Sequence, residues 1–209
     1  MRNIQGSSII EENWAIKHIG RPPKKILDFG SGPKAQFAKQ LAQKGFEVFC
    51  LDQRPCEIEE KIPNLTYIQG DILLIWNKIK ITFDVILNIS TIEHVGLEGR
   101  YNSRNVPDGD LEAMKLLGEL LSDGGVHILS VPVGIDAVIA PFHRVYGENR
   151  LPKLLKNWDV KKEQYWIKDS NNEWILSSKD IALKEIPTGP ERPHYYALGL
   201  FLLTKKQNA

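Results

Sequence analysis

The 209-residue sequence has only two cysteines, Cys50 and Cys56, and this scarcity excludes two kinds of small protein. A disulfide-stabilised scaffold needs more cysteines, and a structural zinc site needs a paired spacing that these two lack. Reduced thiols in a cytosol are the simpler interpretation. We therefore expect a cytoplasmic protein.

Long apolar runs and an excess of one charge are also missing. The most apolar stretch, 197–203, is far shorter than the roughly 20 residues that cross a membrane, and residues 1–25 hold no run of signal-peptide length. Lys and Arg number 27 against 26 Asp and Glu, which leaves a formal net charge of +1. We expect no membrane partner, and this balance gives no general reason to expect a nucleic acid.

The composition that remains is that of a soluble globular protein. Hydrophobic residues make up 42% of the chain and charged residues 25%, which excludes disordered, collagen-like and fibrous classes. No internal repeat or low-complexity tract stands out. The length fits one domain with a sizeable core.

Short apolar runs alternate with helical patterns over the first two thirds of the chain. Ser8 and Glu11 have the spacing of a capping box, which predicts an N-terminal helix ending at Gly20. Apolar residues also recur at helical spacing after Pro33 and over 110–121. Between and after these helices, apolar runs predict strands at 25–29, 46–51, 65–69, 83–88 and 126–131.

The last third is less periodic. Residues 132–150 are predicted to form a long loop and 151–158 a helix. Apolar runs at 164–167 and 174–176 flank a turn-forming sequence and predict a hairpin, and 195–204 predicts a last strand. The whole pattern predicts an α/β fold: a Rossmann-like, doubly wound, mostly parallel seven-stranded sheet with helices on both faces and an antiparallel C-terminal hairpin.

A glycine turn follows the first predicted strand. Asp28 closes that strand, Gly30, Ser31 and Gly32 follow, and Asp52 lies twenty residues beyond Gly32 at the end of the second strand. Such glycines let a ligand approach the backbone, and an acid in the place of Asp52 can accept hydrogen bonds from ribose hydroxyls. The arrangement predicts a nucleoside-binding site.

The choice of nucleoside stays open at this level. A P-loop is excluded, because no Gly-Lys-Ser/Thr follows the turn. A nicotinamide dinucleotide is not excluded, since Ala35 stands in the third glycine place of the dinucleotide fingerprint, where alanine is tolerated.

The motif DFGSG at 28–32 resembles the first motif of class I S-adenosylmethionine-dependent methyltransferases. Later pieces occur in a similar order: Asp52, then Gly70 with Asp71, FDVI at 83–86, IEHV at 92–95 and LSDGG at 121–125. The resemblance covers roughly 24–204. Lys34 departs from it, because many members have a third glycine there. STIEHVG at 90–96 with HRVYG at 143–147 also resembles a poorly characterised bacterial subgroup of methyltransferase-like proteins.

The resemblance implies S-adenosylmethionine as the cofactor and a role for each matching residue. Gly30, Ser31 and Gly32 would lie under its methionine and ribose. Asp52 would bind the ribose hydroxyls, and Gln53 would lie along the adenosine. We include Asp28 in the same cofactor-binding set.

The adenine and methyl ends are implied to contact residues after the third and fourth strands. Asp71 would accept from the adenine amino group, although it is also suited to cap a helix, and Ile72 would supply the adjacent backbone N–H. Asn88 would line the methyl-donor pocket. The chain then divides into an N-terminal helix and lead-in (1–23), a cofactor-binding core (24–131) and an acceptor-side region (132–209), all in one domain.

Methyl transfer to a hydroxyl needs an aligned acceptor and a group that removes a proton. His94, in the loop after the fourth strand, titrates near neutrality and is our predicted base. His143 and Arg144, in the long loop, are predicted to orient the acceptor, and Glu93 joins them in the catalytic set. The predicted activity is O-methylation of a small hydroxylated acceptor, such as a sugar.

Three alternatives remain. Glu93, His94 and His143 also resemble three of the four metal ligands of small-RNA 2′-O-methyltransferases, with Ser90 where a second glutamate would stand. The near-zero charge gives that alternative no support, so we predict neither a metal nor a nucleic-acid partner. The other two are a non-catalytic methyltransferase-like binding module and a nicotinamide-dependent oxidoreductase.

Overall fold

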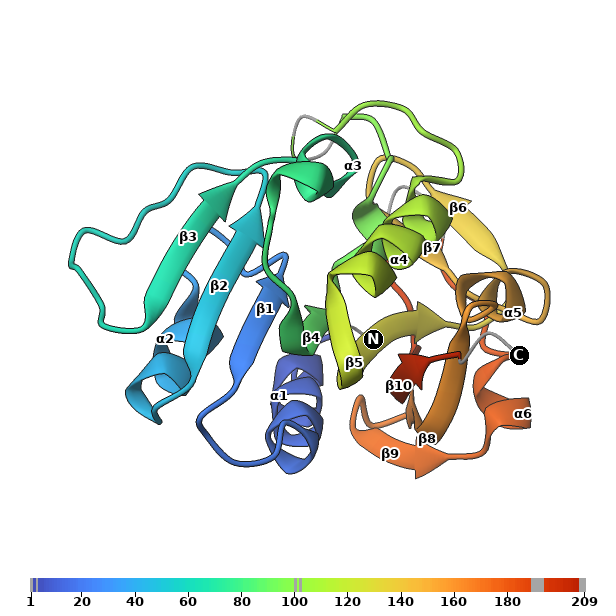
Figure 1. The fold of residues 1–209 in the computed structure, drawn as a ribbon. Helices are drawn as coiled ribbons and strands as arrows, with labels where there is room; N and C mark the ends of the chain where they lie inside the picture. The colour runs from blue at the N-terminus through green and yellow to red at the C-terminus, as the bar shows by residue number, and fades with distance from the viewer. Residues whose placement is uncertain (1, 3, 100, 102, 189–193, 207–209) are drawn as a thin grey trace.

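The computed structural model describes residues 2, 4–99, 101, 103–188 and 194–206. Its centre is one sheet with the strand order β3-β2-β1-β4-β5-β10-β8-β9 (Figure 1). The parallel part consists of β1 (Lys25–Phe29), β2 (Glu47–Asp52), β3 (Leu65–Gln69), β4 (Phe83–Ile89) and β5 (Leu121–Val133). The antiparallel part consists of β10 (Ala197–Lys205), β8 (Trp158–Lys168) and β9 (Trp174–Ser177).

The predicted doubly wound, mostly parallel α/β fold is confirmed, but the strand number is wrong. The sheet has eight strands instead of seven. Both strands of the C-terminal hairpin, β8 and β9, continue the main sheet beyond β10, so neither stands apart from it.

Helices cover both faces of the sheet. Side chains of successive strand residues point to opposite faces, so Ile26 packs with the helices α1 (Ser7–His18) and α2 (Gln36–Gln43). Its neighbour Leu27 packs with α4 (Gly109–Leu120) on the other face. Both side chains are fully buried. Each such burial contributes about 1.5–3 kcal/mol to the fold, which is why these strands read as continuous apolar runs.

The strand order places a crevice beside β1. The chain runs outward from β1 to β2 and β3, then returns through α3 (Ile72–Ile75) and η1 (Trp76–Lys78) to β4 on the other side of β1. Connections that leave two neighbouring strands in opposite directions open a crevice at the carboxyl ends of the strands, and ligands of such sheets bind there.

The N-terminal helix forms, but its predicted capping box is wrong. Residue Gly6, in the left-handed region at φ 85°, precedes α1, and no side chain caps the helix. Glu11 is instead buried against the sheet, where it accepts hydrogen bonds from Ser90 and Ser130. Local spacing cannot reveal partners so far away in the sequence.

The last third is more regular than predicted. The expected loop over 132–150 contains a small antiparallel pair, β6 (Ala137–Ile139) and β7 (His143–Val145). The helix α5 (Arg150–Leu154) is shorter than expected because β8 begins at Trp158, and a short helix α6 (Lys179–Ala182) was not predicted.

β5 also runs past Pro132, although the predicted strand ended at residue 131. β4 pairs with β5 only as far as Ser130, and beyond it that edge of β5 has an isolated bridge to Tyr146, whose N–H donates to the carbonyl of Pro132 at 3.0 Å. A proline is tolerated at such a position because no ladder bond needs its missing N–H.

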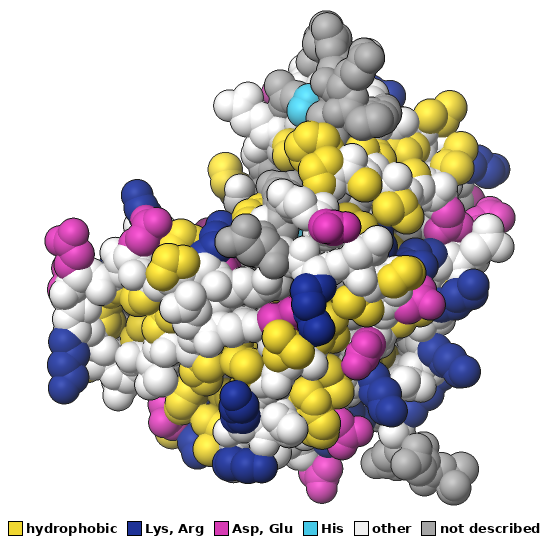
Figure 2. Space-filling view, turned by 90° about the horizontal axis from the view of Figure 1, so that it is seen from above, with side chains coloured by type: hydrophobic (Ala, Val, Ile, Leu, Met, Phe, Trp, Pro, Cys, Tyr) yellow, Lys and Arg dark blue, Asp and Glu magenta, His cyan; other side chains and the backbone are white. Residues whose placement is uncertain are grey.

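The surface at the carboxyl ends of the parallel strands is seen from above in Figure 2. Lys and Arg side chains are interspersed there with Asp and Glu, in keeping with the net charge of +1. Within the part of the chain that the structure describes, no helix has the length and apolar character needed to cross a membrane.

Candidate nucleoside and acceptor site

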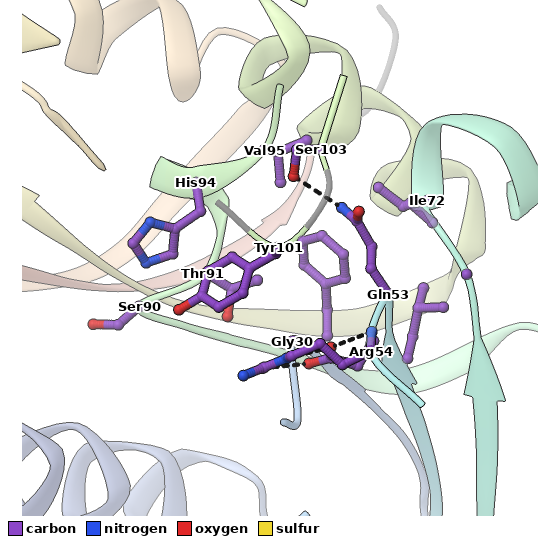
Figure 3. A pocket seen from close by; sticks show the side chains of 14 residues that line it. Gly30, Gln53, Arg54, Ile72, Ser90, Thr91, His94, Val95, Tyr101 and Ser103 are labelled. Atoms are coloured by element: carbon purple, nitrogen blue, oxygen red, sulfur yellow. Dashed lines mark hydrogen bonds and ion pairs between the residues drawn. The ribbon is translucent and has the colours of Figure 1, made fainter. Parts of the chain in front are cut away.

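A cavity lies at the predicted crevice, with about 560 Å³ of empty space that includes its opening to solvent. Its walls come from the ends of β1 and β2, the turns after β3 and β4, η2 (Ile92–His94) and the segment that follows η2. Gln53, Ser103 and Ile72 lie on one side of it, and His94 and Ser90 on the other (Figure 3).

Gly30 begins the glycine turn because another side chain occupies the space beside it. It lies at φ 78°, and a Cβ atom there would be 2.2 Å from Thr91 Cγ2. Only glycine combines that left-handed backbone with so close a contact. The turn after β1 and the turn after β4 are thereby packed directly together at the cavity wall.

Asp52 lies at the end of β2, lines the cavity, and is fully engaged by hydrogen-bond donors. Its Oδ2 accepts from the backbone N–H of Gly32 at 2.8 Å and from Arg54 Nη2 at 2.8 Å. Its Oδ1 accepts from the backbone N–H of Arg54 at 2.9 Å and from Arg54 Nε at 2.8 Å. A carboxylate has about four acceptor positions, so all of them are used.

These contacts also determine the charge of Asp52. Burial by itself would raise the pKa of the Asp52 carboxyl, but the hydrogen bonds and charge of Arg54, with that from Gly32, outweigh it and hold the pKa below its ordinary value. Asp52 is therefore ionised at neutral pH.

Arg54 lines the cavity and is partly exposed to solvent. Its guanidinium carbon lies 4.7 Å from the centre of the Tyr101 ring, a cation–π distance, and its side chain is 37% exposed. On the far side of the cavity, Gln53 Nε2 donates to Ser103 Oγ at 3.4 Å (Figure 3). The segment after β4 is thus tied to the end of β2 at two points.

Asp28 lies in the wall behind the cavity and does not line it. Its side chain is buried on the face of the sheet that α1 and α2 cover. Burial, and then the negative charge of Asp52, raise the pKa of Asp28 to about 7. Near neutral pH this carboxyl is therefore partly protonated.

Of the residues predicted to hold the adenine and the methyl end of the cofactor, only some line the cavity. Ile72 lines the cavity, whereas Asp71 caps α3 by accepting from the N–H of Leu73 at 3.0 Å and borders a neighbouring hollow. Asn88 is fully buried, and its Oδ1 accepts from the N–H of Ile92 at 3.2 Å. Ser31 and Gly32 lie beside the cavity without lining it.

His94 is the one member of the predicted catalytic set that lines the cavity. Its Nδ1 lies 2.5 Å from the carbonyl oxygen of Phe142, and its ring meets Tyr101 edge-on with centroids 5.7 Å apart. A carbonyl can only accept, so Nδ1 carries a proton, and in the neutral form of the ring the lone pair is at Nε2. Nε2 is 3.7 Å from Glu93 Oε1.

Glu93, His143 and Arg144 are buried away from the cavity. Arg144, 1% exposed, donates to the carbonyl oxygens of Val95 at 2.6 Å and Pro107 at 3.1 Å, so it anchors the segment after η2. Its position does not support the predicted contact with an acceptor. The His143 ring packs edge-on against Tyr195.

Of the three residues of the metal alternative, Glu93 and His94 lie close together, with Oε1 and Nε2 3.7 Å apart. In the described residues, His, Cys, Asp and Glu nowhere form a group of three or more that could hold a metal ion. Glu93, His94 and His143 therefore do not form the ligand set that their order in the sequence suggested.

Several cavity residues were not predicted. Arg54, Thr91, Val95 and Ser103 line the cavity, and of these only Thr91 and Val95 fall in a motif noted in the sequence, STIEHVG at 90–96. Arg54 could have been suspected, since an arginine two residues after an acidic strand end is within reach of that acid. No comparable signal points to Ser103, which the segment after η2 brings back to Gln53.

The sequence matches one known protein family. Residues 39–188 match the family described as "Caenorhabditis protein of unknown function, DUF268". No curated protein matches the sequence.

Solved structures share the fold over nearly the whole chain. A TehB-like SAM-dependent methyltransferase from Corynebacterium glutamicum has a TM-score of 0.59 at 18% identity, over 94% of this chain and 87% of its own. The 1,6-didemethyltoxoflavin-N1-methyltransferase of Burkholderia thailandensis was solved with bound 1,6-didemethyltoxoflavin and S-adenosylhomocysteine. It has a TM-score of 0.63 at 13% identity, over 97% of this chain and 80% of its own. NodS of Bradyrhizobium japonicum, an N-methyltransferase solved with S-adenosylhomocysteine, has a TM-score of 0.59 at 13% identity, over 96% of this chain and 85% of its own. The fold is that of class I S-adenosylmethionine-dependent methyltransferases, as the sequence motifs predicted.

Proposed function

The chain belongs to the family described as "Caenorhabditis protein of unknown function, DUF268", and we propose that it is an S-adenosylmethionine-dependent methyltransferase. The observation that carries this proposal is the position of Asp52. Its ionised carboxylate lines a cavity at the point where the strand order reverses, beside the glycine turn of a methyltransferase fold.

The residues present fit this cofactor on one condition. Asp52 would bind the ribose hydroxyls, Gln53 and Ile72 would border the adenosine, and Gly30 would lie beneath the ribose. Because all acceptor positions of Asp52 are engaged, Arg54 must first withdraw its guanidinium. The side chain of Arg54 is 37% exposed and can turn toward solvent. When bound, the cofactor supplies an electrophilic methyl group on a sulfonium.

We propose O-methylation of a small hydroxylated acceptor, such as a sugar, at the side of the cavity where His94 and Ser90 lie. The lone pair at His94 Nε2 would take the proton of the acceptor hydroxyl, and the carbonyl of Phe142 would keep the ring oriented. The ring of Tyr101 would exclude water from one side of the imidazole. We expect the reaction to take place in the cytoplasm.

Thermal unfolding in the presence of candidate cofactors tests the proposal. S-adenosylhomocysteine should raise the melting temperature and NAD should not, because only a ligand of the native state stabilises it. Stabilisation by NAD alone would favour the oxidoreductase alternative. Stabilisation by S-adenosylhomocysteine, without transfer of labelled methyl groups to any sugar or metabolite tested, would favour the binding-module alternative.

A further inference from the structure

Three residues far apart in the sequence meet next to the acceptor side of the cavity. Glu11 comes from α1, Ser90 follows β4, and Ser130 lies in β5. One carboxylate oxygen, Glu11 Oε1, accepts from Ser90 Oγ at 2.5 Å and from Ser130 Oγ at 2.6 Å. Glu11 is 3% exposed. A buried carboxyl group therefore has two hydroxyl donors on the same oxygen.

The direction of these hydrogen bonds follows from the groups involved. Ser130 Oγ also accepts from the backbone N–H of Ser90 at 2.9 Å, and an N–H can only donate. The hydroxyl proton of Ser130 is then directed to Glu11, and so is that of Ser90. The Ser90 oxygen retains only lone pairs for any further partner.

The two hydrogen bonds keep this direction whether Glu11 is ionised or carries a proton on Oε2. Burial raises the pKa of the Glu11 carboxyl, while the hydrogen bonds from Ser130 and Ser90 lower it. Glu12 of the same helix adds a like charge. If Oε2 takes up a proton, Oε1 becomes the carbonyl oxygen of the acid, which again can only accept.

One other side chain faces the Ser90 hydroxyl from the far end of the chain. The Tyr195 hydroxyl interacts with Ser90 and Ser7, and burial and the charge of Glu11 raise its pKa. A serine oxygen has two lone pairs, so contact with Tyr195 leaves one for a ligand.

Ser90 is held in an uncommon backbone conformation at this point. It lies at φ 45°, in the left-handed region that residues other than glycine avoid, at a cost of about 1–3 kcal/mol. The ring of bonds to Ser130 and Glu11 keeps it there. Ser90 lines the cavity on the same side as His94 (Figure 3).

We propose that Glu11 is a specificity-determining residue: by fixing Ser90 as a hydrogen-bond acceptor, it selects an acceptor substrate that presents an O–H or N–H group. This inference rests on the proposed function and adds a substrate class to it. A carbonyl or ether in the same position would face only lone pairs, which costs the binding free energy of one unmade hydrogen bond.

Matched probes test this selection directly. Phenol and anisole differ by an O–H against an O–CH3, and saturation-transfer NMR on protein saturated with S-adenosylhomocysteine measures the affinity of each. Wild type should bind phenol about tenfold more tightly than anisole. In Glu11→Leu the preference should fall below about twofold, because Ser90 can then donate its proton. Glu12→Leu, the same change one residue along, should keep the preference.

Each result decides the inference. Equal affinities in wild type, no binding of either probe, or an unchanged preference in Glu11→Leu would overturn it. Ser90→Ala, which should also lose the preference, gives the answer if Glu11→Leu does not fold. Wild type that does not bind S-adenosylhomocysteine contradicts the proposed function itself, and that titration precedes the others.

Discussion

Arg54 and Asp52 form a two-pronged ion pair: the guanidinium Nε donates to Oδ1 at 2.8 Å and Nη2 donates to Oδ2 at 2.8 Å. Such parallel bonds are the strongest contact between these two groups. Together with two backbone N–H groups they use every acceptor position of the carboxylate that we assign to the ribose. In the proposed complex, Arg54 would therefore compete with the cofactor for Asp52.

Replacing Arg54 with methionine should raise the affinity for S-adenosylhomocysteine. The change keeps much of the packing on Tyr101 and frees two acceptor positions, so we expect a gain of about tenfold by calorimetry. Arg54→Lys keeps the charge without the fork and should fall between the two. A lower affinity in Arg54→Met would mean that Arg54 holds the cofactor directly.

Replacing His94 with glutamine should slow methyl transfer without weakening cofactor binding. A general base contributes roughly 10²–10⁴-fold to rate, and the amide cannot take a proton. Once labelled S-adenosylmethionine has identified an acceptor, the turnover number should fall by at least about 100-fold. His18→Gln, on α1, serves as the control. A rate equal to wild type would remove His94 as the base.

The buried carboxyl of Asp28 should make stability depend on pH. Its pKa in the folded protein, about 7, is above the ordinary value of 3.8, so the fold favours the protonated acid. That contribution is complete below pH 3.8 and is lost as the pH rises toward 7, by up to about 1.4 kcal/mol per pH unit.

Urea unfolding at pH values from about 5 to about 8 measures how the free energy of unfolding depends on pH. Asp28→Asn should flatten the decline in the free energy of unfolding, because an amide does not ionise. Glu47→Gln, at an exposed position of β2, should leave the decline as in wild type. The same slope in Asp28→Asn and wild type would contradict the assignment.

Gly30→Ala should destabilise the protein through its contact with Thr91. The new Cβ would lie 2.2 Å from Thr91 Cγ2, so we expect a loss of about 2–4 kcal/mol in the free energy of unfolding. Gly124→Ala shares the positive φ, 74°, but nothing lies within 4 Å of the added atom. That control should lose only about 1 kcal/mol. Equal losses would show that backbone conformation alone requires glycine at position 30.

The parts of the fold that follow from local periodicity were predictable from the sequence. The strands ending at Phe29 and Gln69 lie where predicted, because their buried runs have no other stable interpretation. The position of Asp52 at the cavity follows from the same reasoning, since parallel strands end at one edge.

Contacts between distant side chains were not predictable. Glu11 has the spacing of a helix cap, yet it meets Ser90 and Ser130, 79 and 119 residues away. Arg144 stands among residues typical of a binding loop, yet burial gives it four backbone carbonyl partners and no place in the cavity. Both cases depend on which way a side chain points, and a single sequence does not contain that information.

Calorimetric titration of S-adenosylhomocysteine into wild type and Asp52→Asn tests the central claim most directly. Wild type should bind about one equivalent, and Asp52→Asn, with its melting temperature checked, should bind about 10–100-fold more weakly because the charged acceptor of the ribose hydroxyls is gone. No binding by wild type, or equal affinities in the two proteins, would contradict the account.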